Sequence, residues 1–307
     1  MGGGRWDTGS YTRSASARAA CGKKDFEYTE SEEAKTKVHS NLDPRRINKK
    51  PFQKLESRDS DEHPNSNAIF MSFDVTGSNL QNAQVAQKKL PNLMEMLIRY
   101  IDDPQVLIAA NDDDEYVGER ALQISDFESD NRVDEHLRNI ILLGQGGGND
   151  HESYDLVLYA AAYRTEIDCF EKRGKKGYFF MYADEPVPTH LEASAVKMAF
   201  GGQADEGRVA ITKVIADLKK MYNVFIIWPQ NGYKHARKQY ETLFGKECVV
   251  TLQHPNLICE LVGSLVGIME EKISEKDVVH ELVKFWATPA AAAEVKTAVH
   301  GYLVARG

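Results

Sequence analysis

The chain has 307 residues, 42% of them hydrophobic and 27% charged, an ordinary composition for one large globular domain with additional segments. Its formal net charge of −8 argues against a general binding surface for nucleic acid or for anionic membranes. No run of about 20 apolar residues is present, so no membrane-spanning helix is expected. Four cysteines form no CxxC pair, which predicts free, buried thiols in a reducing, cytoplasmic setting: Cys21, Cys169, Cys248 and Cys259.

Residues 1–65 differ in composition from the rest of the chain. They are polar with mixed charge, and their apolar residues are scattered. Such a segment cannot bury much apolar surface by itself. We therefore expect an N-terminal arm that is partly disordered or docked along another surface.

From residue 66 onward, short apolar runs alternate with helical patterns. Runs that are apolar throughout are typical of strands covered on both faces, and they occur at 68–73, 105–110, 121–125, 177–183, 223–228 and 247–252. Helical patterns occupy 79–89, 91–101, 132–143, 152–174, 205–222 and 255–273. This alternation predicts an α/β domain over 66–272, with a doubly wound, mainly parallel sheet flanked by helices.

Prolines indicate two helix starts. Pro91 is expected to open a new helical turn after the pattern at 79–89. A helical tail is expected over 273–307, made of two helices. Thr288 as N-cap and Pro289 at the first helical position mark the start of the second one.

Asp74, Thr76 and Ser78 follow the first predicted strand, at the end of a sheet where ligands bind in doubly wound folds. Because Gly77 lets the chain bend, a loop can turn these three oxygens toward one point. Carboxylate and hydroxyl oxygens suit Mg²⁺, Mn²⁺ or Ca²⁺ better than zinc. The alternative is a simple capped turn, with Ser78 as the N-cap of the next helix.

Other polar stretches are expected at the same edge of the sheet. The glycine-rich loop at 142–155 carries Asn149, Asp150 and Glu152, which are candidate metal ligands or N-caps of the following helix. Asp184 ends the strand at 177–183. The acidic run at 112–114 follows another strand and is interpreted as a solvated loop, the alternative being a place beside the metal.

The motif at Asp74, Thr76 and Ser78 resembles the metal-ion-dependent adhesion site of the von Willebrand factor A domain family, in which Asp-x-Ser/Thr-x-Ser follows the first strand. The family also places an Asp after its fourth strand. Asp184 matches it, although Glu185 stands where the family usually has glycine.

The family's remaining ligand is a threonine after a glycine turn, and Asn149 or Asp150 stands there in this chain. The resemblance covers about residues 66 to 270, with the glycine turn about 70 residues and the strand-end Asp about 110 residues after the motif. The flanking segments are similar to those of stand-alone bacterial and phage-encoded proteins of this family.

The resemblance implies a divalent-cation-dependent protein-binding or assembly module, in which Mg²⁺ (or Mn²⁺ or Ca²⁺) recognises an Asp or Glu of a protein partner. No nucleophile–base pair is evident, so binding is expected rather than catalysis, with no nucleic acid or membrane partner. Family members are often encoded near ring-forming ATPases, which makes such an ATPase a partner by analogy only. One alternative is a self-associating structural protein with a vestigial site. Another is a Mg²⁺-dependent phosphohydrolase with Asp74 as nucleophile, although such enzymes need an Asp where Thr76 stands.

Overall fold

A computed structural model describes residues 4–49, 54–77, 79–113, 117–142, 144, 152–201, 207–230, 232–285 and 287–307, with the side chains at 48, 49, 81, 82 and 285 excepted. Within these ranges no helix is long and apolar enough to cross a membrane. All four cysteines are free, as expected, and three of them are buried. Cys21 is exposed, so the prediction of burial is wrong for this residue, which follows a helix with no buried side chain.

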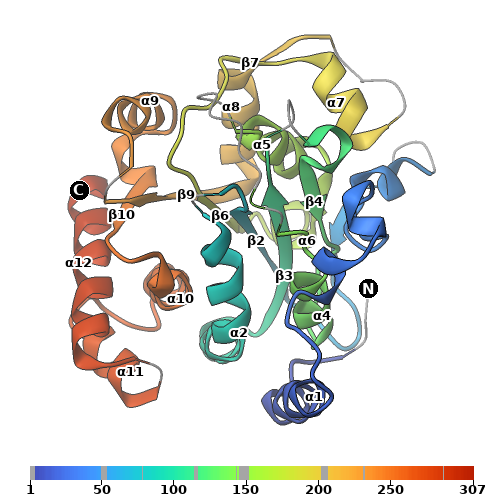
Figure 1. Ribbon diagram of the computed structural model, residues 1–307. Helices are drawn as coiled ribbons and strands as arrows, with labels where there is room; N and C mark the ends of the chain where they lie inside the picture. Colours follow the sequence, from blue (N-terminus) through green and yellow to red (C-terminus); the bar gives the residue numbers. More distant parts are fainter. Residues whose placement is uncertain are drawn as a thin grey trace.

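The centre of the molecule is a six-stranded sheet with the strand order β10-β9-β6-β2-β3-β4 (Figure 1). Its strands are β2 (Ser66–Asp74), β3 (Asp103–Asn111), β4 (Leu122–Ile124), β6 (Gly177–Tyr182), β9 (Tyr222–Pro229) and β10 (Val249–Leu252). All are parallel except β4, which runs antiparallel to β3. Every predicted apolar run forms one of these strands, and the predicted fold class is confirmed. All nine residues of β2 are buried, because helices cover both faces of the sheet.

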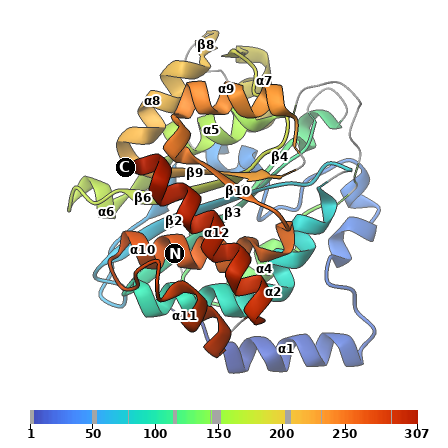
Figure 2. The same ribbon diagram turned by 90° about the vertical axis from the view of Figure 1, so that its left-hand side faces the viewer.

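Figure 2 shows the sheet between two layers of helices. One layer holds α2 (Leu80–Tyr100), α4 (Arg132–Arg138), α10 (Ile258–Met269), α11 (Val278–Phe285) and α12 (Pro289–Arg306). The other holds α5 (Tyr154–Tyr163), α7 (Ala193–Phe200), α8 (Ile211–Met221) and α9 (Lys234–Phe244). Successive side chains of a strand point to opposite faces, so Met71 and Phe73 enter one core while Phe70 enters the other.

Smaller elements surround the sheet. They are α1 (Thr8–Ala20), α6 (Asp168–Glu171), the parallel pair β1 (Leu55–Ser57) and β5 (Thr165–Ile167), the antiparallel pair β7 (His190–Leu191) and β8 (Val209–Ala210), and the short 3₁₀ helices Glu27–Glu30, Glu33–Lys35, Pro44–Lys49, Gly118–Arg120, Lys246–Cys248 and Pro255–Leu257.

Pro91 lies inside α2 and does not open a new helical turn, so that prediction is wrong. A proline within a helix leaves the carbonyl four residues earlier without its amide donor. Here that carbonyl belongs to Gln87, and it accepts a hydrogen bond from the Tyr11 hydroxyl at 3.2 Å. A contact from a distant segment thus compensates for the missing amide, and α2 continues.

The helical pattern at 152–174 is also interrupted. Residues Thr165–Ile167 form β5, which pairs with β1 and separates α5 from α6. The pairing partner lies about 110 residues earlier in the chain, so the local pattern gave no sign of it.

The described part of the N-terminal arm is docked against the domain. Trp6, Val38 and Leu42 are buried in the same core as α2 and α12. The Leu42 carbonyl accepts a hydrogen bond from the Ile124 amide at 2.8 Å. Ile124 belongs to β4, the edge strand, so the arm covers an edge that would otherwise offer free backbone groups.

A buried polar network holds the start of this arm. Asp103 accepts a hydrogen bond from Arg5 at 3.0 Å, and His63 Nδ1 lies 3.3 Å from the same oxygen. His63 Nε2 and Ser129 Oγ lie 3.0 and 2.8 Å from the Gly4 carbonyl. His63 stands between Ser129 and Asp103, so the three side chains are arranged like the Ser, His and Asp of a hydrolase triad. Because the arm's own carbonyl engages both Ser129 and His63, we interpret the network as an anchor for the arm.

The predicted start of α12 is confirmed. The Thr288 side chain accepts a hydrogen bond from the Ala291 amide at 3.3 Å, and Pro289 is the first residue of the helix. We expect Thr288→Ala to lower the free energy of unfolding by about 1 kcal/mol, because the cap is lost. Urea denaturation measures this change. Thr288→Ser keeps the oxygen and should stay close to wild type, and an equal loss in both variants would contradict the capping role.

Candidate metal and ligand site

Three neighbouring strands end at one edge of the sheet. β2 lies between β3 and β6 and runs parallel to both, so the carboxyl ends of all three strands lie together. Asp74 is the last residue of β2 and pairs in register with Asn111, the last of β3. Asp112 follows directly, and Asp184 comes two residues after the end of β6. Strand register therefore places these carboxylates near one another.

The loop after β2 folds around the Asp74 carboxylate, which is fully buried. Asp74 Oδ1 accepts hydrogen bonds from the Thr76 amide at 2.9 Å and from the Thr76 hydroxyl at 2.6 Å. An Asp that bonds to the amide two residues later is a common turn former. The Asn79 amide then bonds to the Thr76 carbonyl at 2.9 Å and completes the turn. The structure thus brings together Asp74 and Thr76, as predicted.

Two residues that the sequence reasoning missed join Asp74 to Asp184. The Tyr154 hydroxyl lies 2.6 Å from Asp74 Oδ2 and 3.2 Å from Asp184 Oδ1. The Asn79 side-chain amide lies 3.2 Å from Asp74 Oδ2 and 3.0 Å from Asp184 Oδ2. Both donors therefore bridge the two carboxylates. Asn79 could have been suspected because it directly follows the motif, whereas Tyr154 reads as an ordinary core aromatic.

Further carboxylates are buried beside this pair. Asp112 and Asp113 are buried, so their interpretation as part of a solvated loop is wrong; the register of β3 carries them to the same edge as Asp74. Glu152, a predicted candidate, is also buried, and its Oε2 has no hydrogen-bond partner among the residues that the structure describes. The cluster is thus larger than the predicted ligand set.

Burial and mutual repulsion raise the pKa values in this cluster. Burial is the main cause for Asp74, whose pKa rises to about 6 with an added contribution from the charge of Asp184. Burial likewise raises the pKa of Asp112 to about 7, with the charges of Asp74 and Asp113 adding to it. The pKa of Glu152 rises to about 10, first through burial and then through the charge of Asp74. Such a cluster needs protons or a cation to balance its charge.

The other predicted ligands, Ser78, Asn149 and Asp150, lie outside the described residues, as does Asp114. Gly144, near the start of the glycine-rich loop, does lie against the motif. A Cβ on Gly77 would stand 3.2 Å from the Gly144 carbonyl, and Gly144 itself has a φ of +62°, which favours glycine. The start of this loop therefore lies directly against the motif at Asp74 and Thr76.

Oxygen atoms of Asp74, Thr76, Asp184 and Glu152 are the described groups that could contribute to a cation site. In the parts of the chain given above, no three His, Cys, Asp or Glu side chains form a group able to hold a metal by themselves. Hydroxyl oxygens, waters or residues outside these parts would have to complete the coordination. The all-oxygen donor set and the unpartnered, buried Glu152 oxygen fit a hard cation such as Mg²⁺ or Ca²⁺.

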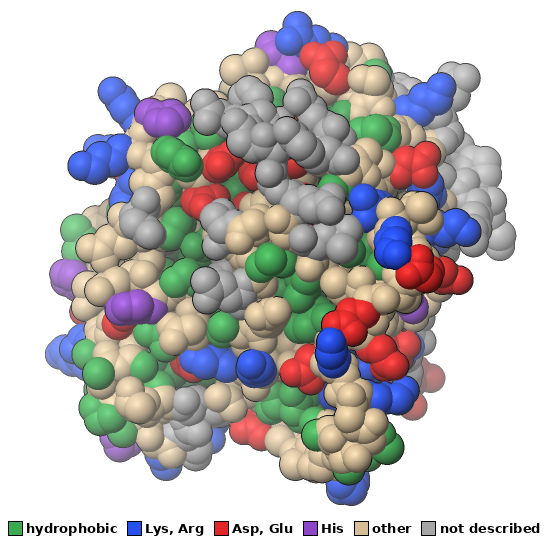
Figure 3. All heavy atoms as spheres, viewed as in Figure 1, with side chains coloured by type: hydrophobic (Ala, Val, Ile, Leu, Met, Phe, Trp, Pro, Cys, Tyr) green, Lys and Arg blue, Asp and Glu red, His purple; other side chains and the backbone are tan. Residues whose placement is uncertain are grey.

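Acidic and basic side chains are interspersed over the face of the molecule shown in Figure 3. Several acidic side chains lie in the upper part of this view. Among the described side chains of this face, Lys and Arg form no extended basic area of the kind typical of a nucleic-acid surface.

No protein-family model matches the chain, and no curated protein matches it in sequence. Among solved structures it is similar to proximal thread matrix protein 1 of the mussel byssus (13% identity, TM-score 0.43, covering 67% of this chain and 46% of that one). It is also similar to the pilus adhesin SpaC of Lactobacillus rhamnosus GG (10% identity, TM-score 0.45, covering 73% of this chain and 31% of that one). A third similar structure is a von Willebrand factor type A protein of Catenulispora acidiphila (15% identity, TM-score 0.38, covering 66% of this chain and 42% of that one).

The chain thus spans less than half the length of each of these structures. At such identities the likeness concerns the fold alone. The chain itself has a mixed α/β fold, with a mainly parallel sheet between two helical layers.

Proposed function

We propose that the chain is a divalent-cation-dependent binding module, in which Mg²⁺, Mn²⁺ or Ca²⁺ recognises a carboxylate of a protein partner. Asp74, Thr76 and Asp184 would hold the cation, with Glu152 beside them. Ser78 and either Asn149 or Asp150 are the further ligands that the sequence suggests.

The observation that carries this proposal is the gathering of carboxylates, most of them buried, at the ends of three adjoining strands. Asp74, Asp112 and Glu152 all have raised pKa values, since burial and like charges disfavour their ionised forms. A bound cation would reverse this penalty, because opposite charge favours the ionised form.

The donor set supports binding in particular. A cation held by few protein carboxylates keeps several coordination positions for water. A partner's Asp or Glu is the protein group that best replaces such a water, because its oxygens are hard and negatively charged. This chemistry defines the expected partner as a protein with an accessible carboxylate.

The cation requirement can be tested by thermal unfolding of wild type and Asp74→Asn in metal-stripped buffer, with Mg²⁺, Mn²⁺ and Ca²⁺ added separately. At about 100 times the dissociation constant, a bound cation stabilises the folded state by about 2.7 kcal/mol. We expect this response in wild type and its loss in Asp74→Asn. Glu32→Gln, which removes an exposed carboxylate on the arm, is the matched control and should respond like wild type.

Equal responses in wild type and Asp74→Asn would refute the cation site at this place. If no cation stabilises any variant, the self-associating structural alternative gains support instead. Light scattering with and without chelator then measures self-association directly.

A further inference from the structure

The outer edge of β10 is open. β10 pairs with β9, and no other described strand pairs with it. The Leu252 carbonyl accepts a hydrogen bond from the Gln230 amide at 3.2 Å, so the peptide groups of Leu252 face the sheet. Because these groups alternate in direction along a strand, those of Val249 and Thr251 point away from the sheet.

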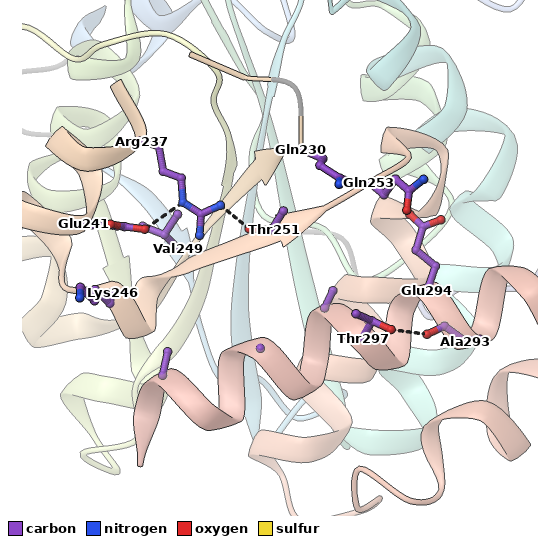
Figure 4. A pocket seen from close by; sticks show the side chains of 13 residues that line it. Gln230, Arg237, Glu241, Lys246, Val249, Thr251, Gln253, Ala293, Glu294 and Thr297 are labelled. Carbon is purple, nitrogen blue, oxygen red and sulfur yellow. Dashed lines mark hydrogen bonds and ion pairs between the residues drawn. The ribbon is translucent and has the colours of Figure 1, made fainter. Parts of the chain in front are cut away.

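A cavity of about 590 Å³ lies along this edge, between α9 and α12 (Figure 4). Its volume falls in the range of about 300–1,000 Å³ typical of ligand sites. Val249 and Thr251 line it from the strand. From α12 it is lined mainly by short side chains at one-turn spacing, namely Ala293, Thr297, Gly301 and Ala305. These short residues leave room beside the exposed peptide groups.

The two ends of this groove carry different charges. Near the start of β10 lies Lys246, for which the described part of the chain offers no ion-pair partner. Arg237 lies farther along the strand, where it donates to Glu241 at 2.8 Å and to the Thr251 hydroxyl at 2.7 Å. Near the end of β10 lies Glu294, 2.6 Å from His254 Nδ1. Figure 4 shows Lys246 and Glu294 near opposite ends of β10.

We propose that this groove binds an extended segment of a partner protein, which adds to β10 as an antiparallel strand. Such strand addition takes its affinity from main-chain hydrogen bonds, for which the Val249 carbonyl and the peptide groups of Thr251 face outward. The Val249 amide already donates to the Lys246 carbonyl. In an antiparallel strand the carboxyl-terminal part of the segment lies near the start of β10. An acidic residue there would meet Lys246, and a basic residue at the other end would meet Glu294.

A single strand suits the groove better than a second copy of the chain does. α9 and α12 flank the open edge on opposite faces of the sheet, and a symmetric edge-to-edge pair would bring α12 of one copy against α12 of the other. The groove is also distinct from the carboxylate cluster, because it lies along the sheet edge and not at the strand ends around Asp74.

The test uses a fluorescein-labelled synthetic peptide with blocked ends, K-T-V-T-V-T-E, and fluorescence anisotropy. A second peptide with proline in place of the central threonine removes a main-chain donor. We expect wild type to bind the first peptide at least about tenfold more tightly than the second. Binding should be the same with Mg²⁺ and with chelator, which separates this proposal from the cation-dependent function.

Gly301 is a position at which the groove can be blocked. A Cβ there meets nothing within 4 Å, so a larger side chain should leave the fold intact. The control is Val304→Trp, which puts the same side chain at an exposed position of α12 outside the groove and should bind as wild type does. Gly301→Trp should fill the groove and weaken binding by about tenfold or more while the melting temperature is retained. Lys246→Glu should reverse the charge preference and favour a peptide ending in Lys.

The proposal is overturned if wild type does not bind the peptide, if Gly301→Trp binds as tightly as Val304→Trp, or if the proline peptide binds equally well. Sedimentation equilibrium tests the other possible occupant of the groove, a second copy of the chain. A dimer that Gly301→Trp abolishes would assign the edge to self-pairing and overturn peptide binding.

Discussion

In metal-free buffer, the free energy of unfolding of this protein is expected to fall as the pH rises from about 5 to about 8. Asp74 and Asp112 have folded-state pKa values of about 6 and about 7, both above their ordinary value of 3.8. Between the ordinary and the raised pKa, the folded state holds a proton that the unfolded state has released. Stability therefore decreases with rising pH, and the loss is complete once the pH passes the folded-state pKa.

The expected slope is about 1.4 kcal/mol per pH unit for each group that is protonated in the folded state only. Glu152 extends the decline to higher pH, because its pKa rises to about 10. A saturating divalent cation should flatten the profile, since it stabilises the ionised carboxylates that would otherwise repel each other.

Urea denaturation at several pH values measures this profile. Asp112→Asn removes one of the contributing groups and should give a shallower decline. A profile that rises from pH 5 to 8 in chelator would contradict the prediction, because it would mean that the carboxylates are stabilised in their ionised form without a cation.

Tyr154→Phe is expected to destabilise the metal-free protein by about 1.5–3 kcal/mol, the usual range for a hydrogen bond to a charged group. Its hydroxyl lies 2.6 Å from Asp74 Oδ2 in a fully buried place, so water cannot replace it. Losing it leaves Asp74 and Asp184 joined through Asn79 alone among the contacts described.

Tyr163→Phe is the matched control, since Tyr163 is on the same helix and its hydroxyl donates to Asp217 at 2.7 Å. Asp217 is less buried and also pairs with Lys220, so water can take the place of this hydroxyl and the loss should be below about 1 kcal/mol. Urea denaturation measures both losses in the free energy of unfolding. Equal losses would show that the hydroxyl bridging Asp74 and Asp184 contributes no more to stability than the hydrogen bond to Asp217.

Much of the fold could be predicted because the strands of this sheet are covered on both faces and therefore apolar throughout. The same topology made part of the site predictable. β2, β3 and β6 are neighbours and parallel, so polar residues that follow them in sequence meet in space. Asp74, Thr76 and Asp184 are brought near one another in this way.

The misses have a common cause, which is contact with a distant segment. In the sequence, Asp112 and Asp113 look like part of a solvated acidic run. The register of β3 against β2 places them beside Asp74. Tyr154 looks like a core residue because nothing local shows that its hydroxyl reaches two carboxylates. β5 exists because a strand from the arm pairs with it.

The hydrogen bond from Tyr11 to the Gln87 carbonyl gives the N-terminal arm a mechanical role. Pro91 weakens the middle of α2, and α1 contacts that helix on both sides of the proline. Tyr11 donates to the Gln87 carbonyl before it, and the Thr8 hydroxyl donates to Glu95 after it at 2.8 Å. α2 begins at Leu80, directly after Asn79, which bridges the two site carboxylates. A cut or displacement of the arm is therefore expected to loosen the start of α2 and, with it, the position of Asn79 between Asp74 and Asp184.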